Sequence, residues 1–426
     1  MKTRGADPTE VSDSDRRRAL FAGSVGNGFE WFDWTIYALL APWFAKEFFP
    51  ESIASAALLS SFAVFAVGFL ARPLGGLVFG WLTERHGRAA CLKIAIFLMA
   101  FSGLAMGLAP TAPMIGTWAA LFIVVVRLVQ GFAFGGELPA AVSYLTYFSP
   151  ANRTARFLSW YGVSMGAATL FGSVLVLGLN WWLSDDQMAV YGWRVPFLVG
   201  AVIAVYGLYV RTRAPQDLHP ETSSAREHWR KLFKESARGA VVTAVAAASA
   251  PAVFFAAIAA FPATAIALRV NSDTAYLVNA AALALMVALI FVAPLAAERW
   301  SLRSVWATAI LLNALVIAVG FAVFYASPGT AVTVQLAIVV PFAFVQGTVQ
   351  ALCVSTLHPA VIGLAMGTAW TIPASLIGGT APMLMAWANK HGHPMYFVWY
   401  LVAVCVIAGV VVLAIGKPRP KDTDRL

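Results

Sequence analysis

The sequence predicts an all-α membrane protein that crosses the bilayer twelve times. Of its 426 residues, 60% are apolar and only 12% are charged, and the mean hydropathy is +0.76. Water-soluble domains carry about 25% charged residues. Apolar runs of about 20 residues, the length that spans a bilayer as a helix, recur along the whole chain. Together these observations exclude a water-soluble fold.

The apolar runs give the spans in order, and one polar segment divides them into two groups of six. This segment, Arg211 to Arg238, is the longest polar stretch of the chain. We expect a linker there with a solvated charged face and an amphipathic helix at 225–238. The predicted spans are 18–44, 54–82, 90–110, 116–147, 156–180, 191–212, 239–267, 275–297, 304–325, 331–356, 360–387 and 395–415. The predicted organisation is a tail at 1–17, a first half at 18–212, a linker at 213–238, a second half at 239–415 and a tail at 416–426.

The formal net charge of +9 is explained by the topology of the chain. Most lysines and arginines fall in the segments that lie on the same side as the two termini. The opposite side holds only Lys46, Arg194, Arg269 and Lys390. Because cytoplasmic segments are enriched in Lys and Arg, we expect both termini to be cytoplasmic in a cell membrane. The basic charge therefore indicates the orientation of the chain and not a nucleic-acid partner, and as an integral membrane protein the chain is expected to contact membrane lipid.

Two acidic residues, Glu30 and Asp33, lie in the middle of the first span. A charge at this depth costs about 2.5–3.5 kcal/mol on insertion scales. Their spacing places them on one helix face with Asn27 and Tyr37. This pattern predicts a site that handles protons or substrate and faces an internal cavity.

The fourth span carries Arg127, Gln130 and Glu137 on one broad helical stripe. An arginine in a membrane keeps its proton, so it needs a carboxylate or an anionic ligand as partner. We predict that Asp33, Glu30 or Glu137 carries the coupling proton and that Arg127 contacts an anionic substrate. The alternative is that Arg127 belongs to a purely structural ion pair.

Further substrate contacts are expected from both halves. The first half offers Trp34 and Tyr37 besides Gln130, and the second half offers Gln346, Gln350 and Trp370. The aromatic residues suit a cage for a quaternary ammonium group. They also suit interface belts and ordinary helix packing. The cysteines and histidines show no metal-ligand spacing, and no metal site or enzyme motif is expected.

Two short matches between the halves indicate an internal duplication. Thr83-Glu84-Arg85 is echoed by Ala297-Glu298-Arg299, and Val129-Gln130-Gly131 is echoed by Val345-Gln346-Gly347. The offsets are 214 and 216 residues. Parallel six-span repeats of this kind build major facilitator transporters.

The segment from Gly80 to Arg88 resembles the signature loop of the major facilitator superfamily. The resemblance implies a cytoplasmic latch between the halves, since the glycines permit a tight turn and the acid can pair across the halves. The predicted gating residues are Gly80, Glu84, Arg85, Gly87, Arg88 and Arg72, where a structural pairing of Arg72 with an acid is the alternative. The second copy, Glu298 to Arg303, lacks the glycines and does not predict a symmetric latch.

Four stretches resemble the metabolite:proton symporter family over residues 20–215. They are Gly26 to Asp33, Arg72 to Gly76, Arg127 to Glu137 and Gly192 to Phe197. The resemblance implies uptake of citrate, 2-oxoglutarate, shikimate, proline or betaine, with the proton as the only coupling factor and no cofactor.

We therefore expect a monomeric transporter that imports a small organic acid together with protons by alternating access. Uptake of a zwitterionic osmolyte such as proline or betaine is the alternative, which the aromatic residues favour. Efflux of a metabolite or drug ranks third, because the fifth span has Gly162, Gly166 and Gly172 without the expected proline.

Overall fold

The computed structural model describes residues 12–49, 54–86, 88–150, 153–213 and 225–415, without side chains at 54–56, 80–86, 88–92 and 225–226. The helices of the first half are α1 (Asp13–Phe48), α2 (Ala54–Leu70), α3 (Arg72–His86), α4 (Arg88–Gly107), α5 (Ala112–Ile115), α6 (Trp118–Phe148), α7 (Thr154–Trp182), α8 (Asp185–Gln187), the π-helix η2 (Met188–Gly192) and α9 (Arg194–Thr212). A separate helix, α10 (Ala225–Glu235), follows. The second half contains α11 (Ala237–Phe254), η3 (Phe255–Ala259), α12 (Phe261–Ala267), α13 (Ser272–Ile290), α14 (Ala293–Trp300), α15 (Leu302–Ala326), η4 (Pro328–Thr330), α16 (Ala331–Thr356), η5 (Pro359–Val361), α17 (Ile362–Ala365), η6 (Met366–Trp370), α18 (Thr371–Pro373), η7 (Ala374–Gly378), α19 (Ala381–Lys390) and α20 (Pro394–Ile415).

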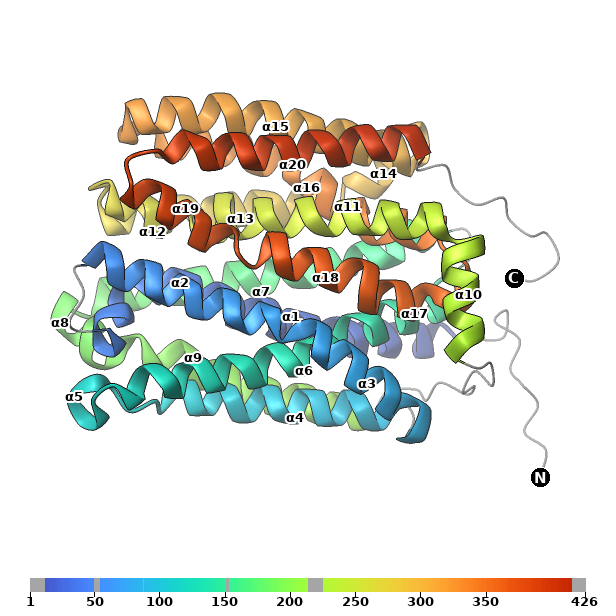
Figure 1. Cartoon of the computed structure of the whole chain (residues 1–426), viewed down its shortest axis with the longest axis horizontal. Coiled ribbons are helices and arrows are strands. Elements are labelled where there is room, and N and C mark those ends of the chain that lie inside the picture. The colour runs from blue at the N-terminus through green and yellow to red at the C-terminus, as the bar shows by residue number, and fades with distance from the viewer. Residues whose placement is uncertain (1–11, 50–53, 87, 151–152, 214–224, 416–426) are drawn as a thin grey trace.

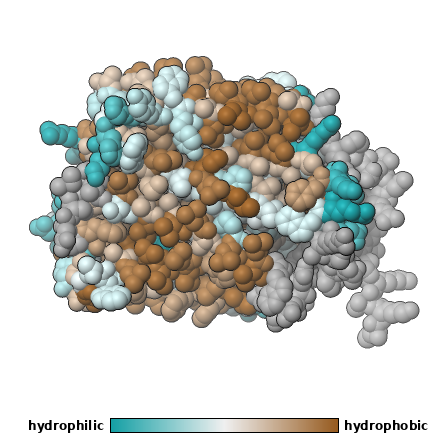
Figure 2. Space-filling view, viewed as in Figure 1, coloured by the Kyte–Doolittle hydropathy of each residue, from teal (hydrophilic) through white to brown (hydrophobic). Residues whose placement is uncertain are grey.

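Twelve helical segments run lengthwise through the described part of the chain (Figure 1). Ten of them are long and apolar enough to cross a membrane. The other two are α1, which is long enough but more polar, and α4, whose apolar run Lys93–Gly107 is shorter. The prediction of an all-α protein with twelve spans in two halves is confirmed. Figure 2 shows hydrophobic side chains over the middle of one face and hydrophilic side chains toward its ends.

Several predicted spans are interrupted in the structure, and a following proline explains two of these interruptions. The span at 54–82 is interrupted at Ala71 between α2 and α3, and the span at 275–297 is interrupted at Phe291 and Val292 between α13 and α14. Each break precedes a proline, Pro73 or Pro294, in the first turn of the next helix. Proline lacks the backbone donor and clashes with the preceding turn, so a new helix starts there.

The two halves pack against each other through several pairs of helices. α13 packs against α7, α19 packs against α2, and α17 packs against α6. The interrupted stretch from η5 to α19 lies beside α2 and α3, and α1 begins and α20 ends at the same end of the bundle (Figure 1). This interface encloses the pocket described below.

Very close packing joins α3 to α6 and fixes the position of Arg72. A Cβ atom at Gly135 would overlap the Arg72 carbonyl, and one at Gly75 would overlap the Phe132 carbonyl. One turn before Gly135, Gly131 likewise lies directly against the backbone of Gly68. Glycines four residues apart allow two membrane helices to approach to backbone contact. The backbone of Arg72 is therefore held against α6.

Gly135→Ala is expected to destabilise the protein by about 1–3 kcal/mol, because its methyl group would push α3 away from α6. Gly178→Ala on α7 is the control, since a Cβ atom there meets nothing within 4 Å. The measurement is the thermal unfolding midpoint of the purified protein in detergent. Equal midpoints for the two variants would contradict this account of the helix contact.

Candidate functional site

Three buried ion pairs lie along one side of α1 in the first half. Glu30 and Asp33 supply two of the carboxylates, and Gly26 contacts the third pair. Glu30 and Asp33 follow Gly26 by four and seven residues, so the three positions fall on one face over two helical turns. The face that the sequence singled out therefore holds a row of paired charges.

The first pair joins Glu30 to Arg72 at the pocket between the halves. Nη2 of Arg72 lies 2.8 Å from Oε1 of Glu30, and both side chains are mostly buried. The Arg72 guanidinium also lies 3.9 Å from the centroid of the Phe69 ring. The structural pairing that was the alternative for Arg72 is therefore present, and it places this arginine at the pocket.

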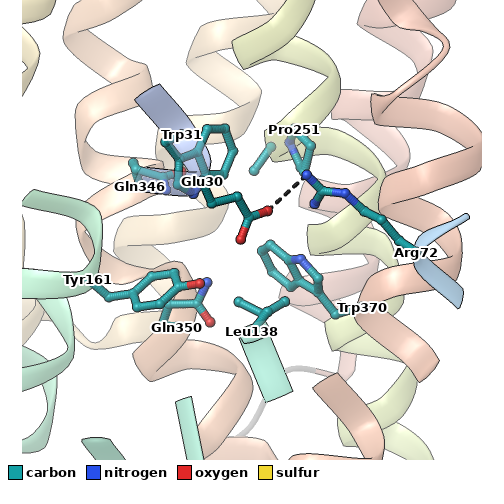
Figure 3. A pocket seen from close by; sticks show the side chains of 10 residues that line it. Glu30, Trp31, Arg72, Leu138, Tyr161, Pro251, Gln346, Gln350 and Trp370 are labelled. Carbon is teal, nitrogen blue, oxygen red and sulfur yellow. Dashed lines mark ion pairs between the residues drawn. The ribbon is translucent and has the colours of Figure 1, made fainter. Parts of the chain in front are cut away.

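The pocket is lined by residues from both halves (Figure 3). The Glu30 carboxylate faces Arg72, with Tyr161 and Gln350 on one side and Trp370 on the other. The remaining lining residues are Trp31, Leu138, Ala250, Pro251 and Gln346. Of the predicted substrate contacts, Gln346, Gln350 and Trp370 thus line this pocket, and so does the predicted proton carrier Glu30. The second half contributes only neutral side chains to it.

The second pair joins Asp33 to Arg127, and neither residue lines the pocket. Nη1 of Arg127 lies 2.7 Å from Oδ2 of Asp33, and Gln130 donates a hydrogen bond of 3.1 Å to Oδ1. The guanidinium lies 4.0 Å from the centroid of the Tyr37 ring. Arg127 is fully buried and paired, as in the alternative of a structural ion pair. Its contact with an anionic substrate stays a prediction.

Trp34 and Tyr37 pack inside the first half in the same region. Both side chains are completely buried. The Trp34 ring contacts Phe65 and Phe69, and the Tyr37 hydroxyl donates to the Ser61 carbonyl at 3.0 Å. Like Gln130 and Arg127, they therefore do not line the pocket.

The third pair joins Glu137 to Arg211, which sequence reasoning missed. The Arg211 guanidinium makes two contacts with the Glu137 carboxylate. The contact from Nη1 to Oε2 is 2.7 Å long, and both side chains are buried. A Cβ atom at Gly26 would overlap both of them. Arg211 lies at the end of a span, where basic residues are common on the cytoplasmic side, so the sequence did not single it out. Only the convergence of α1, α6 and α9 shows its partner.

Asn27 holds α7 in place beside this row. Its amide donates to the Tyr161 carbonyl at 2.8 Å and to the Ser164 hydroxyl at 2.7 Å. Because Tyr161 lines the pocket, the polar face of α1 positions an aromatic ring as well as the charges.

The halves touch on both sides of the pocket. At one end of the bundle, the Trp43 indole donates to the Tyr276 hydroxyl at 3.0 Å, which donates to the Leu39 carbonyl at 2.9 Å. At the other end, Nε of Arg156 lies 2.6 Å from Oε1 of Glu298 in a two-pronged ion pair. The glycine-poor copy of the loop thus supplies a contact between the halves, although its sequence did not predict one.

Most side chains of the predicted gating loop lie outside what the structure describes. Gly87 is not described, and side chains are not described for Gly80, Glu84, Arg85 and Arg88. Their latch role therefore stays a prediction. Among the described residues, no three His, Cys, Asp or Glu side chains come together as metal ligands.

A known family accounts for this architecture. The sequence model of the Major Facilitator Superfamily matches residues 23–382, so the chain belongs to this superfamily and is a membrane transporter rather than an enzyme. Its structure is similar to a D-xylose-proton symporter (TM-score 0.75, 16% identity, 95% of this chain and 99% of that one). It is also similar to the xylose transporter XylE from E. coli in a partially occluded inward-open conformation (TM-score 0.78, 17% identity, 96% and 100% covered). These likenesses show the fold.

Relatives in sequence match about half of the chain. A putative proline/betaine transporter of Staphylococcus aureus (strain COL) is 37% identical over 198 residues, which are 46% of this chain and 42% of that protein. The proline/betaine transporter of Escherichia coli (strain K12) is 33% identical over 233 residues, 55% of this chain and 46% of that protein. The matched stretch thus spans less than half of each relative. These names agree with the resemblance to metabolite:proton symporters.

Gly26→Ala is expected to break the Glu137–Arg211 pair and to lower both the thermal midpoint and the transport rate. The new methyl group would force apart two charges that are costly to bury unpaired. Gly28→Ala is the matched control on the same helix, because a Cβ atom there makes ordinary contacts at 3.5 and 3.6 Å. The midpoint is measured by thermal unfolding, and a Gly26→Ala protein as stable as Gly28→Ala would refute the tight fit.

We expect Glu298→Gln to open one end of the pocket, because it removes the Arg156–Glu298 ion pair that joins the halves there. The Arg156 hydrogen bond lowers the pKa of Glu298, so the pair is intact above the ordinary carboxyl pKa and is lost as pH falls through the lowered value. The measurement is the alkylation rate of a Gln350→Cys variant lacking the native cysteines. Because exposed pairs are weak, we expect a rise of roughly 2–5-fold.

The exchange Arg156→Glu with Glu298→Arg should restore the slow alkylation rate. Glu227→Gln is the matched control, since it removes a carboxylate that pairs with Lys231 within α10 at 3.0 Å. An unchanged rate in Glu298→Gln, or an equal rise in Glu227→Gln, would show that the pair does not hold this end closed.

Proposed function

We propose that this transporter imports a small zwitterionic osmolyte, of the proline or betaine class, together with protons. The observation that carries the proposal is the Glu30–Arg72 pair at a pocket rich in aromatic and amide side chains. The printed names of the sequence relatives support the same substrate class. The organic-acid prediction loses its main argument, since Arg127 is paired with Asp33.

A zwitterion matches the charges that the pocket presents. Its carboxylate can pair with Arg72, whose planar guanidinium binds carboxylates in two-pronged fashion. Its ammonium can lie beside Glu30 and against the faces of Trp31, Tyr161 or Trp370, which attract quaternary ammonium groups. With Glu30 protonated, the substrate carboxylate would thus replace Glu30 as the partner of Arg72, while the aromatic faces hold the ammonium.

Proton coupling in this proposal uses Glu30. A proton on its carboxyl removes one charge of the pair and frees Arg72 for the incoming carboxylate, and loss of that proton restores the pair as substrate leaves. Asp33 and Glu137 stay alternative carriers, because each is also buried against an arginine. We further propose that both termini are cytoplasmic, that the protein lies in the cell membrane and that it works as a monomer.

A second candidate substrate is a small organic acid. With Glu30 protonated, the pocket would present Arg72 together with the amides of Gln346 and Gln350, which is a suitable setting for a carboxylate. Competition between the two substrate classes therefore distinguishes the proposals.

The test is uptake of radiolabelled proline and betaine into proteoliposomes with an acidic exterior, beside 2-oxoglutarate and shikimate. We expect the zwitterions to accumulate, and a protonophore to abolish this accumulation. Uptake of the acids alone would overturn the zwitterion proposal in favour of the second candidate.

Glu30→Gln is expected to retain substrate exchange across the membrane while losing more than about tenfold of the proton-driven accumulation, since it keeps a neutral carboxamide in place of the proton carrier. Asp33→Asn is tested in parallel. Normal proton-driven accumulation in Glu30→Gln would show that another carboxylate carries the proton.

A further inference from the structure

We propose that α10 is an interfacial helix that binds anionic lipid headgroups at the membrane surface. This helix lies between the two halves in the sequence and crosses the end of the bundle rather than running along it (Figure 1). Its last residue, Glu235, is two positions before the start of the span Ala237–Ala259. The helix is therefore at the depth where a membrane-spanning segment leaves the bilayer.

The orientation of α10 about its axis is fixed by the bundle. Leu232 is buried, and α10 contacts α11, η5 and α17. Directly after it, the Ser236 hydroxyl accepts a hydrogen bond of 3.0 Å from the His358 backbone. These contacts therefore determine which faces of α10 point away from the bundle.

One of these faces presents two aromatic rings that are exposed among the residues the structure describes. Trp229 and Phe233 lie one turn apart and stack with their ring centroids 5.6 Å apart. Phe233 is 67% exposed and Trp229 is 37% exposed. Aromatic side chains of this kind are typical of helices that lie in the plane of the membrane interface.

A basic face borders the aromatic one. Arg230 and Lys234 each follow an aromatic residue by one position, about 100° around the helix, and both are exposed. Lys231 lies one turn before Lys234 and pairs with Glu227. Hydrophilic side chains gather at this end of the molecule (Figure 2). An apolar edge beside a cationic edge matches the acyl boundary and the phosphates of anionic lipids.

The positive charges of Arg230 and Lys234 indicate that the ligand of this face is an anionic lipid. Each lysine or arginine near an anionic surface strengthens binding roughly fivefold at physiological salt. Arg230 and Lys234 together are expected to contribute roughly 25-fold on this scale. The inference does not depend on the transported substrate.

The test is hydrogen–deuterium exchange of the full-length protein in nanodiscs of phosphatidylcholine alone or with about one third phosphatidylglycerol. We expect amides of the 225–235 segment to exchange several-fold more slowly in the anionic discs. The protection should be lost in Arg230→Gln with Lys234→Gln and should weaken at high salt. Trp229→Ala with Phe233→Ala should reduce protection in both lipids.

The matched control is Arg269→Gln with Lys390→Gln, which removes two exposed basic residues outside α10. It should leave the lipid effect on α10 unchanged. Equal exchange in both discs, or a lipid effect that survives in the Arg230/Lys234 variant, would overturn the proposal. Protection that disappears on deletion of residues 1–11 would also overturn it, because the N-terminal segment of the chain would then be the occupant.

Discussion

Pairing of the buried carboxylates, Glu30, Asp33 and Glu137 among the described residues, is the constraint on which the packing of the first half depends. Glu30, Asp33 and Glu137 each meet an arginine, and the three arginines come from α3, α6 and α9. A buried charge without a partner costs several kcal/mol. The pairs therefore join α1 to α3, α1 to α6 and α6 to α9, and the positions of these helices cannot be changed independently.

Close helix contacts are what make these pairs geometrically possible. The backbone of Arg72 lies against Gly135, and the Glu137–Arg211 pair fills the space that a side chain at Gly26 would occupy. Apolar packing in lipid lacks the hydrophobic driving force that operates in water, so small residues and polar contacts take its place. The glycines and the charges are thus parts of the same arrangement.

The number of spans followed from the sequence because the length of an apolar run is set by bilayer thickness. The burial of Glu30 and Asp33, and the pocket positions of Gln346, Gln350 and Trp370, followed from helical spacing. The sequence did not predict which acid pairs with which arginine. Asp33 and Arg127 are 94 residues apart, Glu137 and Arg211 are 74 apart, and the sequence allows several combinations of acid and arginine. Arg211 was missed because a basic residue at the end of a span is ordinary.

The two halves contribute different chemistry to the pocket. All of its charge comes from Glu30 and Arg72 in the first half, whereas the second half offers Gln346, Gln350 and Trp370. Trp31 of α1 also stacks on Phe255 of η3, so the second half meets the charged helix through aromatic contact. Since the pair is neutral as a whole, an ion of one sign could bind only after the pair is broken or protonated. Once Glu30 is protonated, a zwitterion offers a carboxylate to Arg72 and a cation to the aromatic rings of the same pocket, which is the physical reason that we prefer it.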